Sequence, residues 1–174
     1  YKRQVDPYYM IQRASDVGVP AGLITAARAV NRSMPSHVAG VVTDLLWSAG
    51  VQAFDARVLL LGWSYKAEVG DPRETPAEPL AATLLAKGIT VGAWDPHIDS
   101  TLFPEGIVAI EDMSTAEGYD LAILVTAHKA CLNIDWADLL GKMRTPIVYD
   151  GRRVLDLDKL KAMGWVTHAV GKPV

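Results

Sequence analysis

Short apolar runs alternate with helical patterns along most of this 174-residue chain. The first of these runs, in RVLLLGW at 57–63, shows no alternation of polar and apolar residues and is bounded by a glycine. Such a run is typical of a strand that is buried on both faces of a parallel sheet. A strand of this kind needs helices on both sides of the sheet, so it restricts the chain to an α/β architecture.

Residues 55–174 repeat this pattern. The expected strands are 57–63, 90–96, 119–127, 145–151 and 165–171, and the expected helices are 75–88, 135–143 and 155–164. Because strands and helices alternate, we expect an open, mostly parallel, three-layer α/β domain with a Rossmann-like sheet.

A long helix is expected before this domain. From Leu23 to Ala49, apolar residues recur every three or four positions, and Gly50 is suited to end the helix. Pro35 predicts a bend or a break near residues 33–35. We therefore divide the chain into residues 1–54, which contain this helix, and the α/β domain of residues 55–174.

Composition narrows the function classes. A formal net charge of −3 and a pI near 5.8 argue against electrostatic binding of nucleic acid. The single cysteine, Cys131, excludes an internal disulfide and a cysteine-based zinc framework, and it reads as a small buried hydrophobe. No apolar run is long enough for a membrane span, no metal-ligand spacing is present, and we expect a cytoplasmic protein without a metal.

Cationic side chains follow the expected strands. Lys66 and Arg73 come after the first strand, and Arg152 and Arg153 come after the fourth. Ligands of open α/β sheets bind outside the carboxyl ends of the strands, so these cations would meet at one rim and suit a diphosphate. A solvated ion-pair network at the surface explains the loop residues equally well.

The loop at 62–76, GWSYKAEVGDPRETP, lacks the glycines of a dinucleotide-binding loop. It contains only Gly62 and Gly70, so it would bind a ligand through side chains, and we do not expect it to be the main dinucleotide site. Asp95 matches the position of a ribose-binding acid but stands alone, and His97 and His128 read as structural residues.

Several segments together resemble one family. The segment LLLGWSYKAEVGDPRETP, the AWDP at 93–96 and the YDGRRVLD at 149–156 resemble the C-terminal nucleotide-sugar-binding domain of the UDP-glucose/GDP-mannose dehydrogenase family. Upstream, VDPYYMIQRA and LITAARAVNRSMPSHV resemble the central region of the same family. These two segments are most similar to the branch that acts on UDP-N-acetylhexosamines.

The resemblance implies an NAD-dependent enzyme that oxidises C6 of a UDP-sugar to a uronate for surface polysaccharide, using a cysteine thiolate and a base. Aligned on the catalytic loop of the family, Lys2 stands where that cysteine is expected, and Asp6 matches the catalytic aspartate. The family's NAD domain has no counterpart in the sequence, so NAD would be bound mainly outside this chain, and the chain alone would be inactive. The abrupt start without methionine leads us to expect part of a longer protein or a processed product.

Position by position, the resemblance assigns Lys66, Arg152 and Tyr65 to the nucleotide sugar and Arg73 to the pyrophosphate of NAD. It also implies a homodimer through the helix 23–49, whose apolar face includes Val38, Val41, Leu45 and Leu46; the same face could instead cover the α/β domain. Two other hypotheses stay open. One is a non-catalytic module that binds nucleotide sugars or serves in assembly, and the other is an unrelated Rossmann-like domain that binds NAD by itself.

Overall fold

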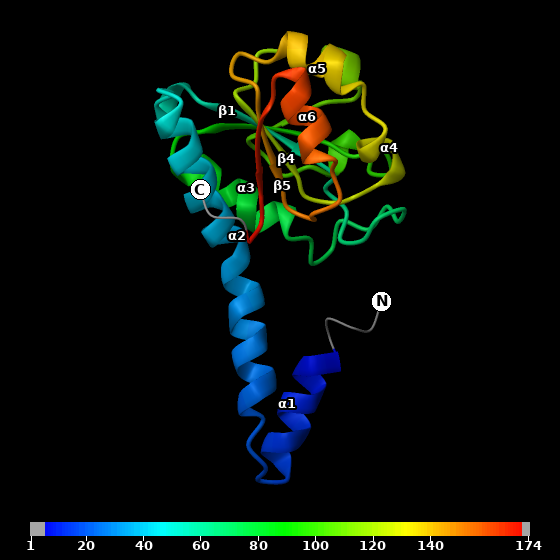
Figure 1. Ribbon diagram of the computed structural model, residues 1–174. Coiled ribbons are helices and arrows are strands. Elements are labelled where there is room, and N and C mark those ends of the chain that lie inside the picture. Colours follow the sequence, from blue (N-terminus) through cyan, green and yellow to red (C-terminus); the bar gives the residue numbers. More distant parts are fainter. Residues whose placement is uncertain (1–5, 172–174) are drawn as a thin grey trace.

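The computed structural model describes residues 6–171 and contains one six-stranded parallel sheet (Figure 1). The strands are β1 (Arg57–Leu61), β2 (Thr90–Trp94), β3 (Ile107–Ala109), β4 (Leu121–Leu124), β5 (Ile147–Asp150) and β6 (Val166–Ala169). Their order in the sheet is β3-β2-β1-β4-β5-β6, and every neighbouring pair is parallel. This is the doubly wound arrangement of a Rossmann-like fold, as the alternation of strands and helices predicts.

Helices cover both faces of the sheet. The α-helices are α1 (Asp6–Asp16), α2 (Gly22–Ser48), α3 (Ala77–Ala86), α4 (Lys129–Leu132), α5 (Trp136–Lys142) and α6 (Leu157–Met163), and three short 3₁₀ turns lie at η1 (Ala53–Asp55), η2 (Ser100–Leu102) and η3 (Met113–Thr115). The two hydrophobic clusters correspond to the two faces: Val58 and Leu60 belong to one cluster, and Leu59 and Leu61 to the other. Because successive strand residues point to opposite faces, the unbroken apolar run of β1 supplies both clusters.

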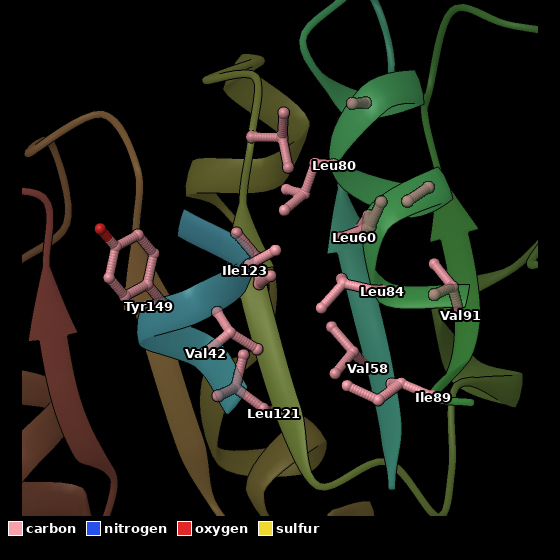
Figure 2. Close-up of a cluster of buried hydrophobic side chains, with 14 of the residues drawn as sticks. Val42, Val58, Leu60, Leu80, Leu84, Ile89, Val91, Leu121, Ile123 and Tyr149 are labelled. Atoms are coloured by element: carbon pink, nitrogen blue, oxygen red, sulfur yellow. The ribbon is translucent and has the colours of Figure 1, made fainter. Parts of the chain in front are cut away.

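The first cluster lies between the sheet and the helices α2 and α3. Figure 2 shows Val42 of α2 and Leu84 of α3 beside side chains of the central strands, among them Ile123. On the opposite face, Trp136 and Leu160 belong to the second cluster. The sheet is therefore a buried central layer, and its loops are left to form sites at its edges.

The helix α2 continues through Pro35, so the predicted break near residues 33–35 is wrong. Pro35 itself is buried, as are Ala39 and Val42 farther along the helix. The proline removes one helical hydrogen bond, but the packing of this half of α2 on the sheet holds the helix together across that position.

The end of α2 follows the prediction. Gly50 has φ +79°, its N–H donates to the carbonyl of Trp47, and the N–H of Val51 donates to the carbonyl of Leu46. These two hydrogen bonds form a Schellman motif, in which the left-handed residue is most often glycine.

Three helices or strands were not predicted: β3, α1 and the four-residue helix α4. The strand β3 has three residues at the edge of the sheet, where Val108 and Ala109 are exposed. The apolar run at 107–110 that contains it is short, and the sequence reasoning assigned it to no element. The helix α1 has no buried residue and lies beside the outer half of α2 (Figure 1). No helix within residues 6–171 combines the length and the hydrophobicity needed to cross a membrane.

The face of α2 assigned above to a dimer partner lies against the sheet of the same chain. Leu45 and Leu46 are buried in the first cluster, and Val38 and Val41 pack against it. A dimer through these four side chains is therefore wrong, because the α/β domain already covers them. The exposed apolar residues of α2 include Leu23 and Val30 in its outer half.

Candidate functional site

The carboxyl ends of β1 and β4 mark the point where the strand order reverses. The chain runs outward from β1 through β2 to β3, returns to β4 beside β1, and then runs outward to β6. In open α/β sheets this is the place where ligands bind. The loop 62–76 follows β1 here, and the loop after β5 lies one strand farther along the same edge.

A cleft of about 1260 Å³ opens at this edge. Tyr65 and Lys66 from the loop after β1 line it, together with Arg152 from the loop after β5. The opposite wall comes from the helices and contains Tyr8, Arg28 and Arg32. The cleft thus joins residues from three separate parts of the sequence, and four of these six side chains are cationic.

Tyr65 and Lys66 are presented by a closed turn. The N–H of Tyr65 donates to the carbonyl of Asp71 at 2.9 Å, which draws the two ends of the turn together. Tyr65 is half-buried and Lys66 is exposed. A lysine in this position offers a compact positive charge to an anion in the cleft.

Asp95 fixes the first residues of the same loop. Its buried carboxylate accepts hydrogen bonds from the N–H groups of Trp63 and Ser64 and from the Ser64 hydroxyl, at 2.6–2.8 Å, and its second oxygen accepts from the N–H of His97. Burial raises the pKa of the Asp95 carboxyl, but the hydrogen bonds from His97, Ser64 and Trp63 outweigh burial and lower it from its ordinary value. Asp95 is thus an ionised structural residue, already engaged by the protein, and it offers no ribose-binding carboxylate.

Asp150 shapes the loop that carries Arg152. Its buried carboxylate accepts four backbone N–H groups in succession at 2.7–2.8 Å, from residues 152 to 155. The Arg152 side chain then returns toward β4, where its Nε donates to the carbonyl of Val125 at 2.5 Å. Loss of surrounding water lowers the pKa of the Arg152 guanidinium, while the neighbouring Tyr65 raises it. Arg152 is therefore a positioned cation beside Tyr65.

Arg73 and Asp6 lie outside this arrangement. Arg73 is exposed and forms a two-pronged ion pair with Asp71, with its Nε 2.8 Å and its Nη2 2.9 Å from the carboxylate. Asp6 is the exposed first residue of α1, and neither residue is among those that line the cleft. Lys2 lies outside the described residues. The structure thus brings together Tyr65, Lys66 and Arg152 and leaves Arg73 and Asp6 apart from them.

The arginines of the helical wall were missed by the sequence analysis. The Arg28 guanidinium donates to the Tyr8 hydroxyl at 3.1 Å, and Arg28 and Arg32 both lie over the Tyr8 ring, with their Cζ atoms 4.8 and 5.1 Å from its centre. This hydrogen bond lowers the pKa of the Tyr8 phenol. The signal available in the sequence was the four-residue spacing of the two arginines, which places both on one face of a helix.

Arg28 retains an unused donor. Its Nε is buried and has no hydrogen-bond partner among the described residues. Buried donors in native proteins are nearly always paired, so an unpaired one beside a cleft points to a ligand or an ordered water.

The start of the loop 62–76 does not fit the role of a dinucleotide cradle. Gly62 has φ +85°, and a Cβ added there would lie 2.5 Å from the carbonyl oxygen of Thr126. This glycine is needed for the close approach of two protein segments and leaves no room for a pyrophosphate. Arg73, the one residue assigned to NAD, is exposed and paired with Asp71.

Comparisons with known proteins agree with the geometry. The UDP-binding-domain model of the UDP-glucose/GDP-mannose dehydrogenase family matches residues 59–157, more than half of the chain. The chain belongs to this family. The hypothesis of an unrelated Rossmann-like domain is therefore wrong.

Three relatives illustrate the likeness. The chain is 28% identical over 170 residues to a UDP-N-acetyl-D-mannosamine dehydrogenase of Methanococcus maripaludis, covering 96% of this chain and 38% of that protein. It is 30% identical over 159 residues to a UDP-N-acetyl-D-glucosamine 6-dehydrogenase of Pseudomonas aeruginosa, covering 89% of this chain and 37% of the relative. The solved structure of a UDP-D-ManNAc dehydrogenase from Pyrococcus horikoshii superposes with a TM-score of 0.80 at 26% identity, over 95% of this chain and 37% of that one. The chain thus spans less than two fifths of the length of these relatives.

Proposed function

We propose that this chain forms the nucleotide-sugar half-site of an NAD-dependent UDP-sugar 6-dehydrogenase. The complete enzyme would oxidise a UDP-N-acetylhexosamine or UDP-glucose to the corresponding uronate, as a precursor of surface polysaccharide in the cytoplasm. The observation that carries the proposal is the cleft in which Tyr65, Lys66 and Arg152 meet at the switch point of a family UDP-binding domain.

The charges in the cleft suit a diphosphate. Lys66 and Arg152 approach it from the sheet, and Arg28 and Arg32 approach it from the helices. Two acids, Glu74 and Glu78, also line the cleft. The cleft is therefore not uniformly positive, and an anion would bind at the individual cationic side chains. We assign the diphosphate to Lys66 and Arg152, the uridine side to the Tyr65 ring, and the unused Nε of Arg28 to a further oxygen of the ligand.

NAD would accept the hydride from C6 of the sugar, and a region outside these 174 residues would bind most of it. Within the chain we assign only Arg73 to this cofactor, as a cation that reaches the pyrophosphate from the rim. We assign Asp6 to the base of the reaction. Both residues lie outside the cleft, so these roles require the rest of the enzyme to bring the reacting groups to them.

Calorimetric titration with UDP, with a UDP-N-acetylhexosamine and with NAD tests the assignment. We expect the two uridine compounds to bind and NAD to bind far more weakly. Replacing Lys66→Ala or Arg152→Ala should weaken UDP binding roughly tenfold to a hundredfold, because each change removes a charge-assisted contact worth about 1.5–3 kcal/mol.

Arg153→Asn provides the matched control for this titration. Arg153 neighbours Arg152 but does not line the cleft, and its φ of +57° is one that asparagine tolerates. The control removes one positive charge from the same loop and should leave UDP binding unchanged. Equal UDP binding by the parent chain and by both the Lys66 and the Arg152 variants would contradict the site, and tight binding of NAD alone would contradict the function.

A further inference from the structure

Two imidazoles and one carboxylate meet beside Asp95, outside the cleft. Oε1 of Glu68 lies 3.8 Å from Nε2 of His97 and 3.8 Å from Nδ1 of His128. These three atoms all lie within 4.8 Å of one another, and no other such group of three was found among residues 6–171. Glu68 comes from the loop after β1, His97 from the loop after β2 and His128 from the loop after β4. The fold therefore brings these three residues together, and their spacing in the sequence does not match a local metal-binding motif.

The hydrogen bonds of His128 determine which of its nitrogens carries the proton. The backbone N–H of Glu68 points at Nδ1 at 3.0 Å, and because an N–H only donates, Nδ1 must hold a lone pair. Nε2 then carries the hydrogen and donates it to Oδ2 of Asp95 at 3.1 Å. Histidines that bind metals characteristically donate their second nitrogen to a carboxylate in this way, which fixes the ring and leaves the other lone pair available.

The distances are close to those that a metal ion requires. Zinc lies about 2.0–2.2 Å from nitrogen and oxygen ligands, and tetrahedral geometry then separates the ligand atoms by about 3.3 Å. The two contacts of 3.8 Å need a closure of about half an ångström, and the two imidazole nitrogens, which lie within 4.8 Å of each other, need a closure of up to about 1.5 Å. His97 is exposed, so its ring has room to swing inward. The Glu68 carboxylate is partly exposed as well, which leaves a route for an ion to enter.

Two of the three ligand atoms already accept hydrogen bonds. Oε1 of Glu68 accepts the N–H of Lys129 at 2.8 Å and can keep it while it binds an ion, because a carboxylate oxygen has two lone pairs, but Nδ1 of His128 has only one. The N–H of Glu68 occupies the lone pair of Nδ1, and Glu68 has φ +62°, a strained value for a residue other than glycine. A rotation of the peptide between Ala67 and Glu68 turns this N–H away and brings that φ back toward the ordinary negative region. Relief of the backbone strain at Glu68 thus favours the same rotation that frees the lone pair of His128 Nδ1 for a metal ion.

We propose that Glu68, His97 and His128 bind one divalent transition-metal ion of the zinc type, with Asp95 as the outer partner of His128. Two imidazoles and a carboxylate form a donor set that zinc accepts, and a water completes the fourth position. The bound ion ties together the loops after β1, β2 and β4. None of its three ligands lines the cleft, so this site is separate from the proposed nucleotide-sugar site.

Titration of the chelator-treated chain with Zn²⁺ tests the site. We expect saturable binding of one equivalent by calorimetry, and Co²⁺ should give the intense visible bands of a tetrahedral complex. The variants His97→Asn and Glu68→Gln each remove a ligand, so each should weaken Zn²⁺ binding by more than the tenfold to hundredfold that loss of an outer partner costs. Both residues are exposed, so we expect both variants to fold, and circular dichroism checks this.

His37→Asn is the matched control, because His37 is an exposed histidine on α2, far along the chain from the cluster. It should leave Zn²⁺ binding unchanged, as should Lys66→Ala, so that failure of this site and failure of the nucleotide-sugar site remain distinguishable. Absence of one-equivalent binding in the parent chain would overturn the proposal, and so would equal binding by the parent, His97→Asn and Glu68→Gln.

Discussion

Cys131 is the only thiol of the chain, and its surroundings make it unreactive. It is fully buried in the second hydrophobic cluster, which confirms its interpretation as a small buried hydrophobe. Burial, together with the nearby negative charge of Asp95, raises the pKa of the Cys131 thiol from 9.0 to about 12. Because the thiolate is the nucleophile, this residue does not take the role of the family's catalytic cysteine.

We predict that Cys131 resists a disulfide reagent at pH 8 while the chain is folded. A pKa of about 12 in place of 9.0 lowers the thiolate fraction at that pH about a thousandfold, and burial excludes the reagent as well. Absorbance of the released thiol gives the labelling rate, and the same chain unfolded in guanidinium is the control. Rapid stoichiometric labelling of the folded chain would show that Cys131 is accessible.

Residues after the strands could be predicted as site residues, because the topology of an open α/β sheet places them at one edge. This reasoning placed four cations at one rim, and the structure brings two of them, Lys66 and Arg152, to one cleft, whereas Arg73 and Arg153 do not line it. Tyr65, which also lines the cleft, was assigned from the family resemblance. The same reasoning could not identify Arg28, because the wall that holds this side chain comes from a helix whose placement is decided by tertiary packing. The role of Asp95 was also missed, because its partners are backbone N–H groups that only the folded loop presents.

Among the secondary-structure elements, the predicted ones are those with strong local patterns. The apolar runs of β1 and β4 and the glycine that ends α2 are readable without any tertiary information. The strand β3 is a three-residue edge strand within the short apolar run 107–110, and α1 has no buried residue, so neither could be assigned from its local pattern alone. The continuity of α2 through Pro35 was mispredicted because packing outweighed the local cost of the proline.

The turn after β1 depends on Gly62, and we predict that Gly62→Ala lowers the free energy of unfolding by about 2–4 kcal/mol. The added Cβ would lie 2.5 Å from the carbonyl oxygen of Thr126, and the φ of +85° is unfavourable for alanine. Urea unfolding followed by circular dichroism measures the effect. The turn that presents Lys66 would shift as well, so UDP binding should weaken in the same variant.

Gly40→Ala supplies the control for this substitution. Gly40 lies inside α2, and a Cβ added there meets no atom within 4 Å. Alanine should therefore raise the free energy of unfolding by about 0.5–1 kcal/mol, because it is the better helix former. If both variants were destabilised equally, the cost at Gly62 would not come from the close approach to Thr126.

At the scale of the whole molecule, α1 and the outer half of α2 project away from the α/β domain (Figure 1). The apolar stripe of α2 is continuous in the sequence, but the domain covers only its second half, which includes Val38 and Leu45. The first half leaves Leu23 86% exposed and Val30 60% exposed. Because an exposed apolar stripe on a helix is unfavourable in water, we expect a partner surface to cover it.

We propose a second copy of the chain as this partner, which keeps the homodimer but moves its contact to the outer half of α2. In a two-fold dimer the same stripe faces itself, so one substitution acts on both sides of the contact. Val30→Glu places two carboxylates in that contact and should raise the dimer dissociation constant at least tenfold, as measured by sedimentation equilibrium. The control is Val166→Glu at the start of the edge strand β6, where the valine is 51% exposed and belongs to neither α1 nor α2. A monomeric parent chain, or a dimer that Val30→Glu leaves as tight as before, would show that the exposed half of α2 is not the contact between copies.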